Sequence, residues 1–75
     1  MTPEQCRTAR ELLGWNDRDL ATAAGCGAET VRVVESGASR PRAPTLARLR
    51  AAFEAAGIEF MDGDRPWVRL RKLAG

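Results

Sequence analysis

The chain has 75 residues, which is enough for one small domain with a modest core. Hydrophobic residues make up 44% of it, but many of these are alanines, so we expect limited stability that self-association would raise. The formal net charge of +2 excludes neither an acidic nor a basic partner. Histidine is absent, and Cys6 and Cys26 form no CxxC pair, so we expect no zinc site and no other cofactor.

Charge and hydrophobicity are unevenly distributed along the chain. Residues 1–37 carry four Arg and six acidic residues, whereas residues 38–75 carry eight Lys or Arg and four acidic residues, and the basic half favours a polyanionic partner. The longest uncharged run, Leu20 to Ala28, is far too short to cross a membrane. The N-terminus begins like a helix rather than a signal peptide, and both cysteines lie in apolar patterns. We therefore expect a cytoplasmic protein with free thiols in its core.

Capping residues and glycines delimit four expected helices, which span about residues 3–13, 17–24, 28–36 and 44–56. Thr2 and Gln5 predict a capping box at the start of the first helix, and Asn16 is a good cap for the second. A glycine follows each helix, as is typical of a left-handed helix end. At helical spacing, the expected inward-facing residues are Cys6, Ala9, Leu13, Val31, Val34, Leu46, Leu49, Phe53 and Ala56.

The periodicity changes after Gly57. Residues 58–60 and 68–71 alternate apolar and polar side chains around the turn-rich segment 62–66, which predicts a β-hairpin. An isolated hairpin is marginally stable in water, so it must pack on the helices, pair with a second copy, or both. The sequence therefore predicts a mainly α fold, with a four-helix core over residues 1–57 and a hairpin tail over residues 58–75.

Residues 16–37 match a helix-turn-helix motif, in which a glycine-containing turn joins two short helices. Gly25 permits the steep turn, and Cys26 follows it as a small apolar plug for the core. The second helix has an inward stripe for anchoring and an outward stripe that suits the major groove of DNA. The inward stripe is Val31, Val34 and Glu35, and the outward stripe is Ala28, Glu29, Arg32, Val33 and Ser36.

With this motif, the chain resembles the lambdoid phage repressor/Cro (XRE) family of transcriptional regulators over about residues 3–57. The matching residues are Leu20, Ala21, Ala24, Gly25, Val31, Glu35 to Gly37, Pro41 and Leu46. The resemblance implies a repressor-like helix-turn-helix domain that binds double-stranded DNA as a homodimer. We expect neither a membrane nor a small-molecule ligand as a partner, because the uncharged runs are short and the chain has no room for a ligand domain.

The resemblance also implies that residues 28–36 form the recognition helix, with Ala28, Glu29, Arg32 and Val33 toward base edges. Arginine with guanine is the commonest specific pairing, and a glutamate can accept a hydrogen bond from cytosine N4. The alternatives are that Arg32 is simply solvated and that Glu29 only complements the helix dipole.

Four further residues would contact the DNA backbone. Thr30 and Arg18 would lie near phosphates. Arg40 and Arg42, in the loop after the recognition helix, would bind the backbone or an adjacent minor groove, and a plain solvated loop is the alternative.

Two residues depart from the family pattern, and a third feature agrees with it. Asp17 stands where the family often has a glutamine that meets the DNA backbone, and its charge would repel phosphate. Gly27 replaces the usual Ser or Thr cap of the recognition helix. Arg10 and Glu35 match a structural ion pair that ties the first helix to the third.

The hairpin is the expected dimer contact, because its free edge can pair across a two-fold axis. The expected interface residues are Ile58, Phe60, Trp67, Val68 and Leu70. Packing of Trp67 on the fourth helix is an equal alternative, and a dimer through another surface also stays open.

The leading hypothesis is a sequence-specific, nucleoid-associated transcriptional regulator that binds a near-palindromic site. The alternative is a protein-interaction module on the same scaffold, of the antitoxin or anti-repressor type, which the acidic front half and Asp17 favour. We do not expect an enzyme, because the chain lacks histidine, a phosphate loop and the size to enclose a substrate.

Overall fold

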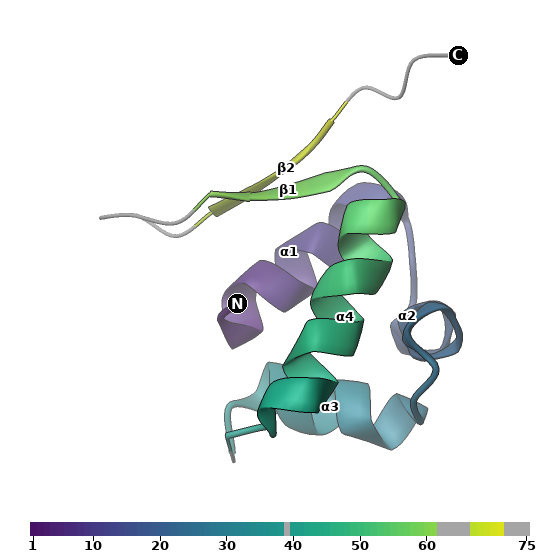
Figure 1. The fold of residues 1–75 in the computed structure, drawn as a ribbon, viewed down its shortest axis with the longest axis vertical. Coiled ribbons are helices and arrows are strands. Elements are labelled where there is room, and N and C mark those ends of the chain that lie inside the picture. Colours follow the sequence, from purple (N-terminus) through teal and green to yellow (C-terminus); the bar gives the residue numbers. More distant parts are fainter. Residues whose placement is uncertain (39, 62–66, 72–75) are drawn as a thin grey trace.

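The computed structural model of the protein describes residues 1–38, 40–61 and 67–71. Four helices precede a two-stranded antiparallel sheet, and their bounds are α1 (Pro3–Leu13), α2 (Asp17–Ala24), α3 (Ala28–Ser36), α4 (Ala43–Ala55), β1 (Ile58–Met61) and β2 (Trp67–Leu70) (Figure 1). This confirms the mainly α fold with a C-terminal hairpin. The predicted bounds of α4 and of the strands differ from the observed ones by one residue. The predicted turn at 62–66 lies outside the described residues.

Side-chain caps hold the start of the first two helices. The Thr2 hydroxyl accepts the Gln5 N–H at 3.0 Å, and Gln5 Oε1 accepts the Thr2 N–H at 2.8 Å. Asn16 and Asp19 form a second capping box at 2.8 and 3.0 Å. The cap residues of α3 and α4, Gly27 and Arg42, make no side-chain capping hydrogen bond. In α4, Pro44 carries no N–H, so only the N–H groups of Ala43 and Thr45 precede the first helical bond, from Leu46 to the Arg42 carbonyl.

A left-handed glycine makes the turn between α2 and α3. Gly25 has φ of +70°, a conformation that other residues adopt only with strain. The Gly25 N–H bonds to the Thr22 carbonyl at 3.3 Å, and the Cys26 N–H bonds to the Ala21 carbonyl at 3.0 Å. These bonds end α2 and turn the chain directly into α3, which begins two residues after Cys26.

One core joins the helices to the hairpin. Of the residues expected to face inward, Leu13 is only half-buried, as are Leu46 and Ala56. Ala52 and Gln5 are buried although they were not among the residues expected to face inward, and Gln5 is 3% exposed. The fully buried side chains come from every helix and from β1: Cys6, Ala9, Leu20, Val31, Leu49, Phe53 and Ile58.

Aromatic contacts tie α4 to the chain segments on either side of it. The Trp15 ring stacks on Phe53 with ring centroids 6.1 Å apart, and Phe53 meets Phe60 of β1 edge-to-face at 5.9 Å. The guanidinium of Arg50 lies 5.1 Å from the centre of the Phe60 ring. Such contacts stabilise beyond the burial of area alone, so Phe60 belongs to the packing of the monomer.

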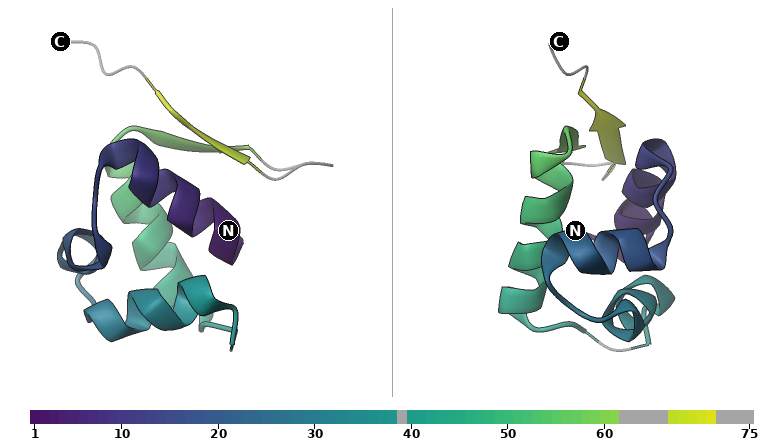
Figure 2. Two further views of the ribbon diagram at one scale, coloured as in Figure 1. Left: turned by 180° about the vertical axis from the view of Figure 1, so that it is seen from behind. Right: turned by 90° about the vertical axis from the view of Figure 1, so that its right-hand side faces the viewer.

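The hairpin and α3 lie at opposite ends of the molecule in every view (Figures 1 and 2). β2 packs along α1 and β1 packs on α4. The side-chain amide of Gln5 donates to the Trp67 carbonyl at 3.3 Å, which links α1 directly to β2. Within the described ranges, no helix is long and apolar enough to cross a bilayer.

Candidate nucleic-acid interface

α3 is anchored on one side and open on the other. Val31 and Val34 are buried, whereas Glu29, Arg32 and Val33 are exposed. No other described element covers the outer side of this helix (Figures 1 and 2). The outward stripe is therefore accessible to a large partner such as a DNA groove.

The other two expected contacts on α3 are less exposed. Ala28 is half-buried and packs against the core, so only part of its methyl group is accessible. Thr30 is half-buried as well and lines a shallow surface pocket between α3 and the start of α4. Thr45, which the sequence analysis did not single out, shares that pocket. The residues around it are Glu29, Thr30, Val33, Val34, Pro41 and Thr45.

Arg32 and Asp17 form an ion pair across the helix-turn-helix motif. The Nε of Arg32 donates to Oδ2 of Asp17 at 2.9 Å. This hydrogen bond lowers the pKa of Asp17 below its ordinary value. The sequence alone predicts an Asp17 charge that repels phosphate and an Arg32 that either contacts DNA or is simply solvated. The structure instead shows two opposite charges that compensate each other.

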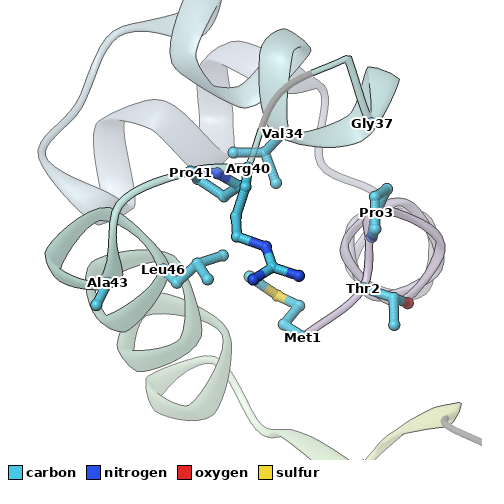
Figure 3. A pocket seen from close by; sticks show the side chains of 9 residues that line it. All are labelled: Met1, Thr2, Pro3, Val34, Gly37, Arg40, Pro41, Ala43 and Leu46. Carbon is cyan, nitrogen blue, oxygen red and sulfur yellow. The ribbon is translucent and has the colours of Figure 1, made fainter.

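Three further arginines lie on the segments that precede and follow α3 in the chain. Arg18 is exposed on the first turn of α2, and Arg42 is the exposed residue that precedes α4. The side chain of Arg40 extends over a pocket between α1, α3 and the start of α4, toward Met1 and Leu46 (Figure 3). Arg40 and Arg42 thus lie beside the uncapped N-terminus of α4, where backbone N–H groups favour an anion.

A second ion pair fixes the position of α3. Arg10 of α1 donates from Nε and Nη2 to the two carboxylate oxygens of Glu35, at 2.8 and 2.9 Å. Arg10 also donates from Nη1 to the Trp15 carbonyl at 3.0 Å, and Arg7 reaches the Glu35 carbonyl at 3.0 Å. The Arg10 and Glu35 side chains are only 20% and 11% exposed. The arrangement orients α3 and leaves neither partner for DNA.

The thiol of Cys6 belongs to the same cluster. Its Sγ lies 3.4 Å from Oε2 of Glu35, and burial together with the nearby carboxylate raises the pKa of Cys6 to about 12. Cys6 is therefore a protonated core residue, whereas Cys26 is half-buried, and both are free thiols. Among the described residues, no group of three or more His, Cys, Asp or Glu side chains is placed to hold a metal ion.

The hairpin residues expected at a dimer contact differ in exposure within one copy. Ile58 and Val68 are 1% and 7% exposed because they face the helices, and Phe60 is half-buried against Phe53. These three side chains pack within one copy. Trp67 and Leu70 remain, at 50% and 45% exposed. The strand that carries Trp67 packs on α1 rather than on α4.

Comparison with known proteins agrees with this geometry. The family model described as helix-turn-helix matches residues 7–59, which include all of α2, α3 and α4. No curated protein matches the chain significantly. Since the match covers more than half of the 75 residues and the structure contains the motif, the chain belongs to the XRE-type helix-turn-helix family of DNA-binding regulators.

Proposed function

We propose that the protein is a sequence-specific transcriptional regulator that binds a near-palindromic DNA site as a homodimer in the cytoplasm. The observation that carries the proposal is the outward stripe of α3, which is exposed while Arg10 and Glu35 hold the opposite side of the helix. Glu29, Arg32 and Val33 contact base edges in the major groove.

In this proposal, residues next to the outward stripe of α3 contact the phosphates. Arg40 and Arg42 bind one DNA strand together with the N–H groups of Ala43 and Thr45 on either side of Pro44, and Thr30 adds a hydroxyl. Arg18 binds the opposite edge of the groove from the start of α2. Ala28 contributes its partly buried methyl group to the base-facing stripe.

The homodimer in this proposal forms through the backbone of β2. The Arg71 N–H bonds to the Gly57 carbonyl, and in the same register Glu59 pairs with Arg69. Since hydrogen-bonded and non-hydrogen-bonded pairs alternate in an antiparallel ladder, Val68 and Leu70 direct their N–H and C=O groups away from β1. This free edge matches the same edge of a second copy.

Edge pairing about a two-fold axis perpendicular to the sheet would join two hairpins into one four-stranded sheet. Because α3 lies at the opposite end of each molecule from the hairpin, both recognition helices would then point toward the same side (Figure 1). That arrangement suits two major-groove half-sites about 34 Å apart. The exposed side chains of Trp67 and Leu70 would then lie on β2, at the junction between the two hairpins.

Selection of bound sequences from a random DNA pool tests DNA recognition. The expected product is a site with two inverted half-sites. We expect Arg32→Ala and Glu29→Ala each to relax one base preference, whereas Arg42→Ala weakens binding to all sequences and makes it less salt-dependent. If no sequence is enriched, the proposal is wrong, and binding of a protein partner by the same scaffold becomes the better hypothesis.

Sedimentation at several concentrations tests the dimer. Leu70→Pro removes the outward N–H of β2, and proline is tolerated on edge strands, so we expect this variant to be monomeric. Leu70→Ala is the matched control, because it shortens the side chain but keeps the N–H. A Leu70→Pro protein that still dimerises would place the interface elsewhere.

A further inference from the structure

The ion pair between Asp17 and Arg32 joins the two helices of the motif. Asp17 is the first residue of α2, and Arg32 is the fifth residue of α3. The contact runs from Nε of Arg32 to Oδ2 of Asp17, at 2.9 Å. Arg32 remains 62% exposed and Asp17 is 32% exposed, so the pair lies on the outward surface rather than in the core.

The contact leaves most of the guanidinium available. It uses Nε, and within the described part of the chain the two terminal nitrogens of Arg32 have no hydrogen-bond partner. Two parallel N–H groups are what a bidentate contact with O6 and N7 of guanine requires. The carboxylate therefore holds the side chain without occupying the edge that would recognise the base.

The pair also changes the electrostatics of α3. A free arginine is attracted to every phosphate, whatever the sequence, and loses rotamer freedom when it binds a base. Beside Asp17, the charge of Arg32 is compensated and its rotamers are already restricted. The non-specific attraction of Arg32 to phosphate is therefore weaker. The specific contact costs less entropy, because the rotamers of Arg32 are already restricted in the free protein.

We propose that Asp17 is a positioning residue that commits Arg32 to reading a guanine and suppresses its attraction to phosphate. This rests on the proposed function of α3 in base recognition. Asp17 itself need not touch DNA. The proposal accounts for an acidic residue beside the proposed DNA surface, since the loss in general affinity is offset by a gain in discrimination.

Two substitutions separate the hydrogen bond from the charge. Asp17→Asn keeps an oxygen that can accept from Nε of Arg32, whereas Asp17→Ala removes it. Affinities are measured for the selected site, for the site with its guanine replaced, and for scrambled DNA, across a salt series. We expect both variants to bind scrambled DNA about 3- to 10-fold more tightly at low salt, with a salt slope steeper by about 1.

The two variants should differ in discrimination. We expect Asp17→Ala to lose about 3- to 10-fold of the guanine preference and Asp17→Asn to keep most of it, while Arg32→Ala abolishes the preference. Glu54→Ala is the matched control, because it removes the carboxylate from another exposed arginine–carboxylate pair, with Arg50 on α4. It should leave discrimination unchanged. Thermal unfolding of each variant checks that it remains folded.

Other outcomes would overturn the inference. If Asp17→Ala raises the affinity for all three DNAs by the same factor, Asp17 only masks charge. If Arg32→Ala retains the guanine preference, Arg32 does not read that base. In both cases the wild-type protein still selects a site, so the proposed function stands. If the wild-type protein selects no site, both the proposed function and the inference about Asp17 are wrong.

Discussion

Arg10 and Glu35 are joined by two parallel hydrogen bonds, at 2.8 and 2.9 Å, although 25 residues separate them in the sequence. The pair connects α1 to the last turn of α3, on the side of α3 that faces away from the proposed DNA surface. Its planar geometry restricts rotation of α3 about its own axis. The direction in which the outward stripe points therefore depends on a contact that never meets DNA.

Glu35→Ala should destabilise the protein by about 2–4 kcal/mol, because it leaves the largely buried Arg10 without its counter-charge. In so small a domain this corresponds to a large fall in Tm. Chemical denaturation gives the free energy of unfolding. Glu54→Ala, in an exposed pair, should cost less than about 1 kcal/mol. Equal losses in the two variants would contradict the structural role of Glu35.

Local signals explain why the fold was predictable. The Thr2–Gln5 and Asn16 caps and the left-handed Gly14, Gly25 and Gly37 act within a few residues of themselves, so their effect can be recognised along the chain. The alternation of apolar and polar residues predicts that the two strands pair. It does not show whether the apolar face of the hairpin is covered by the helices or by a second copy. Ile58 and Val68, which we expected at a dimer contact, are buried between the hairpin and the helices of the same copy.

Contacts between helices were harder to predict. Asp17 and Arg32 lie on different helices and 15 residues apart, and no periodicity links them. Only the crossing of α2 over α3 brings them together. Thr45 was missed for the same reason, since its place beside Thr30 depends on how the loop returns to α4. The Arg10–Glu35 pair was expected solely because of the family resemblance.

Cys6 should make stability fall at alkaline pH. Its pKa is about 12 in the folded protein and near 9.0 in an unfolded chain, so the unfolded state releases the proton first. The stabilisation is complete below pH 9 and is lost as pH rises from 9 toward 12. Over that range, the free energy of unfolding should fall more steeply with pH for the wild type than for Cys6→Ala. Parallel curves would show that the folded thiol ionises normally.

The two thiols should react at different rates. Cys6 is 0% exposed and protonated, whereas Cys26 is half-buried beside the α2–α3 turn. Since the thiolate is the reactive form, a thiol reagent at pH 8 should modify Cys26 first and Cys6 only on unfolding. Mass spectrometry of the timed reaction identifies the modified residue. The Cys26→Ala variant should then show almost no reaction until denaturant is added.

The Asp17–Arg32 pair should be detectable without DNA. Its hydrogen bond lowers the pKa of Asp17, so the stabilisation is present at neutral pH and is lost as pH falls below the ordinary value of 3.8. NMR titration of the Asp17 carboxyl group should give a pKa below 3.8 in the wild type. Arg32→Ala should raise it. An unchanged value would mean that the pair is not populated in solution.

Two glycines of the α2–α3 turn should respond in opposite ways to substitution. Within the described part of the chain, a side chain added at either position would meet no atom within 4 Å apart from those of the glycine and its two chain neighbours. Gly25 has φ of +70°, so Gly25→Ala should cost about 1 kcal/mol through backbone strain alone. Gly27 has φ of −85° and ψ of 154°, as a serine cap does, so Gly27→Ser should add a few tenths of a kcal/mol of stability. Thermal unfolding measures both, and a stabilising Gly25→Ala would contradict the left-handed turn on which the motif depends.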